Sequence, residues 1–398
     1  MAEGESAVED LVTTGARARP RSSSDIAADD DARALPTPAF WKGRRVFLTG
    51  HTGFKGGWLA LWLSQLGAQV RGFALDPYTS PNLFDTACLR SKVDDVRGDI
   101  RDAAALESAM REFAPDVVFH LAAQPLVRLS YADPMTTFET NVMGTARILD
   151  AVRRTPSVRA VVVVTTDKCY ENKEWVWGYR ETDPLGGYDP YSSSKACAEI
   201  VTAAFRQSYF PVEKHGGHGV AIATARAGNV IGGGDWSSDR LIPDLVRGFA
   251  SGTPVPIRRP SAIRPWQHVL EPLRGYLLLA ERLCGSRASE CATAFNFGPA
   301  EEDARSVRWI ADRMAAAWGG AASWVAEEDG GVHEAGYLKL DASRASSVLS
   351  WRPRLHLAAA IDMSVHWFKA HAAGRDMQAE TLQQITAYEA LPERPGLD

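Results

Sequence analysis

Short apolar runs rich in β-branched residues alternate with Ala- and Leu-rich stretches from residue 44 to about residue 209. The apolar runs are typical of strands, which we expect at residues 44–49, 70–75, 93–96, 116–121 and 160–165. The other stretches predict helices at residues 57–66, 103–112, 134–153 and 191–209. Residues 117–119 and 161–164 are apolar throughout, as in strands covered on both faces of a parallel sheet. This alternation predicts an α/β fold with a doubly wound parallel sheet.

A glycine-rich loop, TGHTGFKGG over residues 49–57, joins the first expected strand to the first expected helix. Gly50, Gly53 and Gly56 have the spacing GxxGxxG, which allows a tight turn and a close approach of the backbone to a pyrophosphate. The helix N-terminus adds unpaired N–H donors and a partial positive charge. Because the loop lies directly between a strand and a helix, it predicts a Rossmann-type dinucleotide site rather than a glycine turn without a ligand.

Residues at the ends of the other strands are expected to complete this cofactor site. Asp76 follows the second strand, where a carboxylate binds the ribose hydroxyls of NAD, although the alternative is a loop aspartate before Pro77. Residues after the third strand are expected to border the adenine, and small residues after the fourth to let the cofactor lie close. The predicted cofactor-binding residues are Gly50, Thr52, Gly53, Phe54, Gly56, Asp76, Asp99, Ile100, Ala122, Ala123, Tyr191 and Lys195.

The chain divides by composition into three expected parts. Residues 1–40 are charged and poor in aromatics, which predicts a disordered leader that cannot bury enough apolar surface to fold. Residues 41–228 are expected to form the dinucleotide-binding domain, with some return segments from residues 262–300. Residues 229–398, where Gly, Pro and Arg are frequent at first and helices are expected at 306–318 and 357–372, predict a smaller, partly interleaved C-terminal substrate domain. We expect that domain to close over the C-terminal edge of the sheet, where ligands of such sheets bind.

Charge and cysteine content exclude several classes of protein. With 44 Lys and Arg against 49 Asp and Glu, the net charge of -5 argues against a nucleic-acid-binding protein. The longest apolar runs are far shorter than the roughly 20 residues that a membrane helix needs. Five cysteines without a CxxC pair argue against a disulfide scaffold and favour a reducing cytoplasm. His215 and His218 form an isolated HxxH, so no metal site is predicted.

Tyr191 and Lys195 form a YxxxK motif on one face of an expected helix. A free phenol, with a pKa of ~10, is a poor base at neutral pH. A nearby lysine ammonium favours the phenolate and can also hold a nicotinamide ribose. Thr166 follows the strand at residues 160–165, and we expect its hydroxyl to share a substrate oxygen with Tyr191.

Six segments together resemble the extended short-chain dehydrogenase/reductases that act on nucleotide sugars. They are TGHTGFKG, HLAAQ, NVMGT, TTDKCYEN, YSSSK and RAGNVIGGGDW. Within that family, four segments are similar in sequence to those of the 4,6-dehydratases that take CDP-glucose. They are TGHTGFKGGWL, EWVWGYRE, DPYSSSK and IRPWQHVLEP. The resemblance runs from about residue 40 to about residue 369. It implies an NAD cofactor, a homodimer and a place in the synthesis of deoxysugars for surface polysaccharides.

The resemblance also implies a reaction, an internal redox cycle. Tyr191, as the base, removes the proton of the sugar C4 hydroxyl while the C4 hydride passes to NAD. The new ketone acidifies the C5 proton, water is lost across C5–C6, and the hydride returns to C6. The product is CDP-4-dehydro-6-deoxyglucose. The implied catalytic residues are Thr166, Asp167, Lys168, Tyr191 and Lys195.

Asp167 and Lys168 are the residues implied in the loss of water. Asp167 is the acid that protonates the departing C6 hydroxyl. In the dTDP- and GDP-sugar dehydratases the next position is usually a glutamate, the C5 base, whereas this chain has Lys168, as in the CDP-glucose branch. An ordinary lysine, with a pKa of ~10.4, is almost wholly protonated at neutral pH. Lys168 is therefore either a base with a lowered pKa or a cation that stabilises enolate charge or positions Asp167.

The substrate is expected to lie between the catalytic residues and the C-terminal domain. The predicted substrate-binding residues are Asn229, Arg240, Arg264 and His268. The planar fork of arginine suits a diphosphate. Trp175, Trp177 and Tyr179 are expected either to flank the hexose or merely to pack within their loop.

The dimer is expected to form through the helices at residues 134–153 and 191–209, which by resemblance pair with their symmetry mates in a four-helix bundle. Their apolar residues, Ile148 and Ile200 among them, are too numerous for one buried face.

Three alternative functions are weighed against this one. A 4-epimerase of the same fold needs Tyr191 and Lys195 but no elimination pair, so Asp167 and Lys168 argue against it. A dehydratase for another nucleotide sugar stays open, because no residue recognises cytosine on physical grounds. A dinucleotide-binding regulator without turnover typically lacks a catalytic residue, whereas Thr166, Tyr191 and Lys195 are all present.

Overall fold

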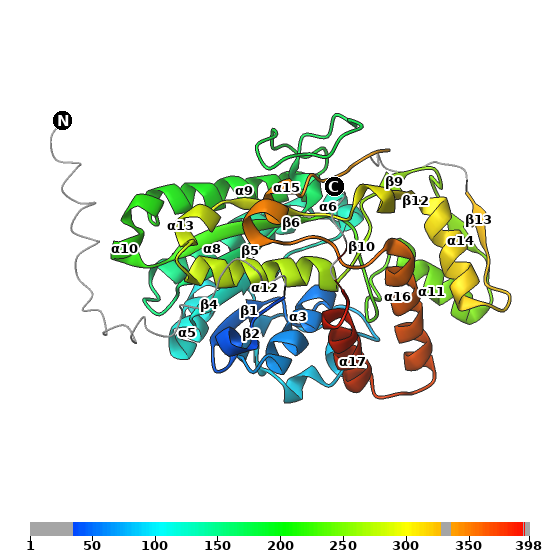
Figure 1. Ribbon diagram of the computed structural model, residues 1–398, viewed down its shortest axis with the longest axis horizontal. Helices are drawn as coiled ribbons and strands as arrows, with labels where there is room; N and C mark the ends of the chain where they lie inside the picture. The colour runs from blue at the N-terminus through cyan, green and yellow to red at the C-terminus, as the bar shows by residue number, and fades with distance from the viewer. Residues whose placement is uncertain (1–34, 328–335, 393, 395–398) are drawn as a thin grey trace. The chain divides into compact units, whose positions relative to one another are not determined.

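The computed structural model describes residues 35–327, 336–392 and 394 (Figure 1). Seven parallel strands form one sheet in the order β11-β6-β5-β4-β1-β2-β3. Their bounds are β1 Arg45–Thr49, β2 Gln69–Ala74, β3 Asp94–Arg97, β4 Val117–His120, β5 Ala160–Val164, β6 Ala221–Ala227 and β11 Ala294–Phe297. This confirms the predicted doubly wound sheet, and the first five strands lie within one or two residues of their expected places.

Helices cover both faces of the sheet because side chains of each strand alternate between two apolar layers. In β1, Val46 and Leu48 belong to the core under one set of helices, while Phe47 belongs to the core under the other. One layer includes α3 and α12, and the other includes α5, α8 and α9 (Figure 1). These helices are α3 Phe54–Gln65, α5 Ala103–Phe113, α8 Gly144–Arg153, α9 Pro190–Ser208 and α12 Leu270–Cys284.

The second half of the chain adds short strand pairs and more helices around the C-terminal ends of the large sheet's strands. The pairs are β7 (Val230–Ile231) with β10 (Gln267–His268), β9 (Ile263–Arg264) with β12 (Arg305–Ser306), and β8 (Val255–Ile257) with β13 (Trp324–Ala326). The longer helices of this half are α11 Leu241–Ser251, α14 Val307–Trp318, α15 Ser343–Leu349, α16 Leu357–Ala372 and α17 Met377–Glu389. α12 and β11 return to the large sheet, whereas α14 packs against α11 and α16. The division at residue 228 stays a prediction.

The described chain begins inside the predicted leader. The backbone N–H and hydroxyl of Thr37 and the indole N–H of Trp41 all donate to the Glu281 carboxylate on α12, at 2.6–3.1 Å. The short helix α2 (Pro38–Trp41) ends with Trp41 fully buried. Residues from Leu35 onward thus pack on the fold, while residues 1–34 lie outside the described part, so the leader's boundary at residue 40 stays a prediction.

The expected helix at 134–153 is divided into three segments. These are α7 (Pro134–Phe138), a π-helical turn at Glu139–Met143, and α8. Within the turn, Asn141 donates to Ser194 on α9 at 2.8 Å and accepts the N–H of Gln124 at 2.8 Å. Single π turns inside helices often occur at functional sites. Here the turn fixes the helix that carries the YxxxK motif.

The remaining short helices connect these elements. They are α4 Leu83–Thr86, α6 Val127–Ala132, α10 His215–His218 and α13 Ala288–Cys291. None of the helices in the described ranges is both long enough and apolar enough to span a membrane.

Candidate active site

The glycine loop between β1 and α3 is shaped by contacts that leave no room for side chains. Gly50 has φ +78°, and a Cβ there would lie 2.8 Å from the backbone nitrogen of Ala122. A Cβ on Gly56 would collide with the carbonyl of Gly50. Gly53 is the N-cap residue of α3, so no capping side chain covers the start of that helix. A bare helix N-terminus at this edge fits the diphosphate of a dinucleotide.

Two threonines fasten this loop to the neighbouring strands. The Thr52 hydroxyl donates to the carbonyl of Leu75 after β2, at 3.0 Å. The Thr49 hydroxyl accepts the N–H groups of Leu121 and Ala122 after β4, both at 3.1 Å. Phe54, Ala122 and Ala123 are half-buried beside the loop. Thr52 thus holds the loop in shape, and the small residues after β4 lie where they were predicted.

The residues that were predicted to bind the adenosine differ in their exposure and contacts. The Asp76 side chain is 88% exposed at the exit of β2 and lies 3.3 Å from the Arg97 guanidinium. The carboxylate of Asp99 accepts hydrogen bonds from Arg101, which holds its pKa below the usual range. Ile100 is buried in the apolar core beside α8 rather than open to a ligand. The side chain of Ile100 therefore packs on α8, and its predicted contact with the cofactor stays a prediction.

Tyr191 and Lys195 lie in the first turns of α9, close to the end of β5. Asp189 caps this helix by accepting the N–H of Ser192 at 2.9 Å, and Ser130 accepts the N–H of Tyr191 at 3.1 Å. The Lys195 ammonium donates to the carbonyl of Val164 at the end of β5, at 3.1 Å. The sequence DPYSSSK thus supplies the cap, a proline in the first turn and both functional side chains in seven residues.

Burial has the largest effect on the pKa values of Tyr191 and Lys195. It raises the pKa of Tyr191 to about 12, against a hydrogen bond with Thr166 and the charge of Arg240, which both lower it. Burial lowers the pKa of Lys195 to about 8, against the charge of Glu199, which raises it. Thr166 and Tyr191 are thus brought together as expected. The charge of Arg240 lowers the pKa of Tyr191, and the predicted effect of Lys195 on the phenolate stays a prediction.

Asp167 and Lys168 follow Thr166 in a short 3-10 turn, Asp167–Cys169. The Thr166 hydroxyl donates to Asp167 Oδ1 at 2.9 Å, and the carboxyl is almost fully buried. Among the described residues Asp167 Oδ2 has no hydrogen-bond partner. Burial raises the pKa of Asp167, although Lys168, Thr166 and Arg264 oppose it. A buried carboxyl with a raised pKa and an unused oxygen is suited to donate a proton.

Two of the four predicted substrate residues lie beside this cluster. Arg240, at the start of α11, is 3.4 Å from Asp235 and within electrostatic reach of Tyr191. Arg264, on β9, is within electrostatic reach of Asp167. Asn229 is half-buried in the connection from β6 to β7.

His268 does not join them. It is fully buried, its Nδ1 accepts the N–H of Leu270 at 3.3 Å, and its ring meets Trp58 of α3 edge-on at 5.8 Å. Burial lowers its pKa to about 3. His268 is thus buried in the described structure, and its predicted place beside the nucleotide stays a prediction.

The aromatic residues between β5 and α9 pack on one another. Trp175 stacks on Tyr179 with ring centroids 5.4 Å apart, and Tyr179 stacks on Tyr170 at 5.2 Å. Trp177 contacts Trp175 but is 60% exposed. This favours the packing interpretation for Trp175 and Tyr179. The isolated HxxH is also engaged in the fold, since His218 is bound to Pro211 and Val220.

A buried ionic network beneath the cluster was not predicted. Glu199, one turn after Lys195, lies 2.8 Å from Arg226 on β6 and accepts hydrogen bonds from Thr165 and Thr224. Both charged side chains are almost fully buried. The network joins α9 to β5 and β6 and so fixes where Tyr191 and Lys195 meet the sheet. An isolated Glu in a helix and an isolated Arg in an alanine-rich strand gave no sign of this pairing.

We expect Glu199→Gln to lower the free energy of unfolding by about 3–5 kcal/mol, because it leaves the Arg226 charge buried without its partner. Urea unfolding measures the loss. The control is Glu290→Gln, which breaks the surface pair with Arg287 and is expected to change the free energy of unfolding far less. Equal effects of the two variants would contradict the assigned role of the network.

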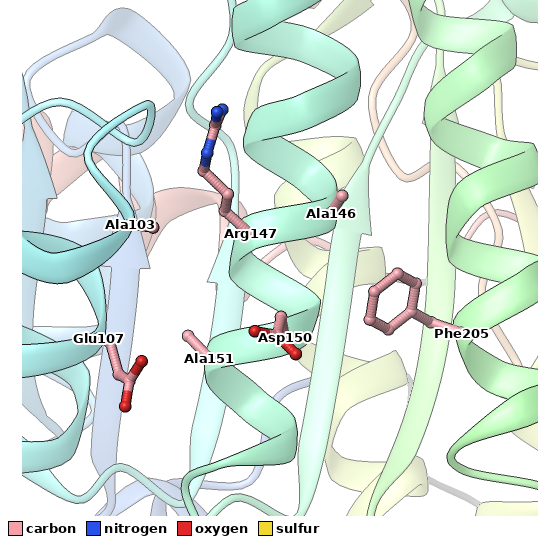
Figure 2. Close-up of a pocket in the computed structure, with 7 residues that line it drawn as sticks. All are labelled: Ala103, Glu107, Ala146, Arg147, Asp150, Ala151 and Phe205. Carbon is pink, nitrogen blue, oxygen red and sulfur yellow. The ribbon is translucent and has the colours of Figure 1, made fainter. Parts of the chain in front are cut away.

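A hollow of about 210 Å³ lies elsewhere, between α5, α8 and α9 (Figure 2). Its lining is Ala103, Glu107, Ala146, Arg147, Asp150, Ala151 and Phe205. None of these belongs to the cluster around Tyr191 and Asp167, so the hollow is separate from the candidate active site.

Comparisons with known proteins agree with this geometry. Residues 46–296 match the model of the NAD dependent epimerase/dehydratase family. The chain is 53% identical over 351 residues to the CDP-glucose 4,6-dehydratase of Salmonella typhimurium, covering 88% of this chain and 97% of that protein. It is 29% identical to a dTDP-glucose 4,6-dehydratase of Streptomyces antibioticus, covering 70% of this chain and 77% of that protein.

Among solved structures, a dTDP-glucose 4,6-dehydratase from Streptomyces venezuelae with NAD bound superposes with a TM-score of 0.70 at 25% identity, covering 84% of this chain and 99% of that one. A UDP-glucuronic acid 4-epimerase from Bacillus cereus shares the fold with a TM-score of 0.70 at 20% identity, covering 82% and 99%. The sequence motifs, the sheet, the glycine loop and these matches lead to one conclusion. The chain belongs to the NAD-dependent epimerase/dehydratase family.

Proposed function

We propose that the protein is a CDP-glucose 4,6-dehydratase, which converts CDP-glucose to CDP-4-dehydro-6-deoxyglucose and water. The observation that carries this proposal is the buried Asp167 carboxyl, with its raised pKa and unused oxygen, bound to Thr166 next to Tyr191. It combines an acid for elimination with a tyrosine suited to oxidation. The choice of CDP-glucose rests on the Salmonella typhimurium relative at 53% identity.

The residues present fit an NAD molecule. The glycine loop allows a close approach of backbone at Gly50 and Gly56, and the N-terminus of α3 is bare. Lys195, buried on α9, would hold the ribose next to the nicotinamide, and Asp76 and Arg97 lie at the strand edge expected to meet the adenosine. When bound, NAD supplies a reversible acceptor for the sugar's hydride.

In this proposal Tyr191 is the base for oxidation at C4. The phenol must lose its proton to act as a base, and with a pKa of about 12 it needs nearby positive charge to do so. Arg240 supplies such charge. Thr166 can hydrogen-bond the same sugar oxygen and so hold the C4 hydroxyl against the phenolate.

In this proposal Asp167 and Lys168 carry out the elimination of water. The ketone at C4 acidifies the C5 proton, and Asp167 donates its proton to the departing C6 hydroxyl. Lys168, half-buried beside it, either takes the C5 proton or stabilises the enolate as a cation. The half-reactions use different side chains, which makes them separable by mutation.

The test is incubation of the purified protein with CDP-, dTDP-, GDP- and UDP-glucose, followed by mass spectrometry of the nucleotide sugars. Loss of water from CDP-glucose alone, or far faster than from the others, is expected. Loss of water from a different nucleotide sugar would change the substrate. An unchanged mass, together with an inverted C4 centre seen by nuclear magnetic resonance, would make the protein an epimerase.

The proposal includes a homodimer formed through α8 and α9. Ile200 is 57% exposed on α9, although Ile148 on α8 is fully buried within the protomer. We expect light scattering to give a dimer at micromolar concentration, and Ile200→Asp to weaken it because the charge would be buried at the interface. A monomeric wild-type protein would contradict this part of the proposal. Five free thiols suit a cytoplasmic enzyme.

A further inference from the structure

The loop between β7 and α11, residues 232–239, packs against the helix that follows the glycine loop. A Cβ on Gly232 would lie 3.2 Å from the ring of Phe54, the first residue of α3. The indole N–H of Trp58, also on α3, donates to the carbonyl of Gly233 at 2.9 Å. This loop therefore lies beside the elements that are expected to hold the cofactor, and it leads directly into α11.

Four side chains of this region form a chain of hydrogen bonds that ends at Arg240. The hydroxyl of Tyr78, in the segment after β2, lies 2.5 Å from the hydroxyl of Ser237. The hydroxyl and the backbone N–H of Ser237 both donate to Asp235 Oδ1, at 2.6 and 3.0 Å. Arg240 Nη1 lies 3.4 Å from the other carboxylate oxygen, Oδ2. Both oxygens of Asp235 are thus engaged, one by Ser237 and one by Arg240.

The direction of these hydrogen bonds follows from the number of protons. A serine hydroxyl has a single proton, and that of Ser237 goes to the Asp235 carboxylate. Tyr78 is therefore the donor to Ser237, and every hydrogen bond of the chain is donated toward the carboxylate. Asp235 and Ser237 are buried, whereas the side chain of Arg240 is 37% exposed. The fold thus sets a buried and firmly held carboxylate against a partly exposed arginine.

Arg240 is one of the predicted substrate-binding residues, and its contact with Asp235 uses one nitrogen, Nη1, of the guanidinium. We propose that Asp235 is a positioning residue that holds Arg240 ready for the phosphates of the substrate, and that Ser237 and Tyr78 hold Asp235 in turn. The inference rests on the proposed function, which brings an anionic nucleotide sugar to this site. An arginine side chain loses rotamer freedom when it binds a ligand, and ordering it beforehand removes that cost from binding.

The experiment is a double-mutant cycle on the affinity for CDP, measured by isothermal titration calorimetry with protein that holds NAD. Arg240→Met should weaken CDP binding roughly 10- to 100-fold, since hydrogen bonds to a charged group are lost. Asp235→Asn, which keeps the size of the side chain, should weaken it roughly 3- to 10-fold, because Arg240 is then ordered only when CDP binds. Tyr78→Phe should have a smaller effect in the same direction. In the Arg240→Met background, neither change should alter the affinity by more than about twofold.

The matched control is Asp362→Asn, which breaks the surface ion pair with Arg313 between α16 and α14 and should leave the affinity for CDP unchanged. If Asp235→Asn failed to fold, Tyr78→Phe would carry the cycle, because it removes only a hydroxyl. Losses that add up in the double variant would overturn the proposal, since Asp235 would then not act through Arg240. Tighter binding of CDP by Asp235→Asn would also overturn it, because the carboxylate would then compete with the phosphates for Arg240.

The result for the wild type separates this inference from the proposed function. If the wild type bound UDP, GDP or dTDP in place of CDP, the proposed substrate would be wrong, while the same cycle with that nucleotide would still test Asp235. If Arg240→Met bound CDP as tightly as the wild type, the inference would be overturned although the proposed function stood.

Discussion

Tyr191→Phe is expected to slow the turnover of CDP-glucose by roughly 10²- to 10⁴-fold, because it removes the base for oxidation and leaves the rest of the site in place. Oxidation at C4 and loss of water should fall together, since the second step needs the ketone made in the first. The measurement is the rate of formation of CDP-4-dehydro-6-deoxyglucose, followed by mass spectrometry.

The matched control is Tyr209→Phe, which removes a hydroxyl immediately after the other end of α9, where the side chain is exposed. It should turn over like the wild type. If Tyr191→Phe retained more than a tenth of the wild-type rate while remaining folded, another group would have to be the base.

Asp167→Asn and Lys168→Met are expected to separate the half-reactions that Tyr191→Phe stops together. Lys168→Met keeps Tyr191, Thr166 and the glycine loop, so it should still form the C4 ketone, while exchange of the C5 proton with solvent and loss of water stall. Asp167→Asn should also form the ketone but lose water roughly 10²- to 10⁴-fold more slowly, because the C6 hydroxyl leaves without its acid. Single-turnover reactions in deuterated water, quenched and analysed by mass spectrometry, measure all three events.

The controls lie within the same experiment, since ketone formation reports an intact oxidation site. If the Lys168→Met variant dehydrated the sugar at nearly the wild-type rate, Lys168 would have no role in the elimination. Lys168→Met that forms no ketone would place this lysine in binding or oxidation. Because burial raises the pKa of Asp167, elimination should also slow as the pH rises and this carboxyl loses its proton.

The sequence predicted the fold well where local pattern and tertiary environment agree. β1, β4 and β5 are buried on both faces, so their apolar runs stand out from the surrounding sequence. β6, AIATARA, was not recognised because its alanines favour helix and because its buried Thr224 and Arg226 bind Glu199 of α9, which lies elsewhere in the sequence. Such a strand is recognisable only once its distant partners are known.

In the candidate site, too, local contacts could be predicted from the sequence and distant contacts could not. The proximity of Thr166 to Asp167, and of Tyr191 to Lys195, could be predicted because a short motif and one helical turn bring each pair together. The burial of His268 could not be predicted, because Trp58, which meets its ring edge-on, lies far away in the sequence.

The central claim is that one site oxidises the sugar at C4, removes water across C5–C6 and returns the same hydrogen to C6. The most direct test is turnover of CDP-glucose deuterated at C4 in ordinary water, with nuclear magnetic resonance of the product. The account predicts deuterium in the C6 methyl group and a solvent hydrogen at C5. Deuterium lost to water, or retained at C4, would contradict it.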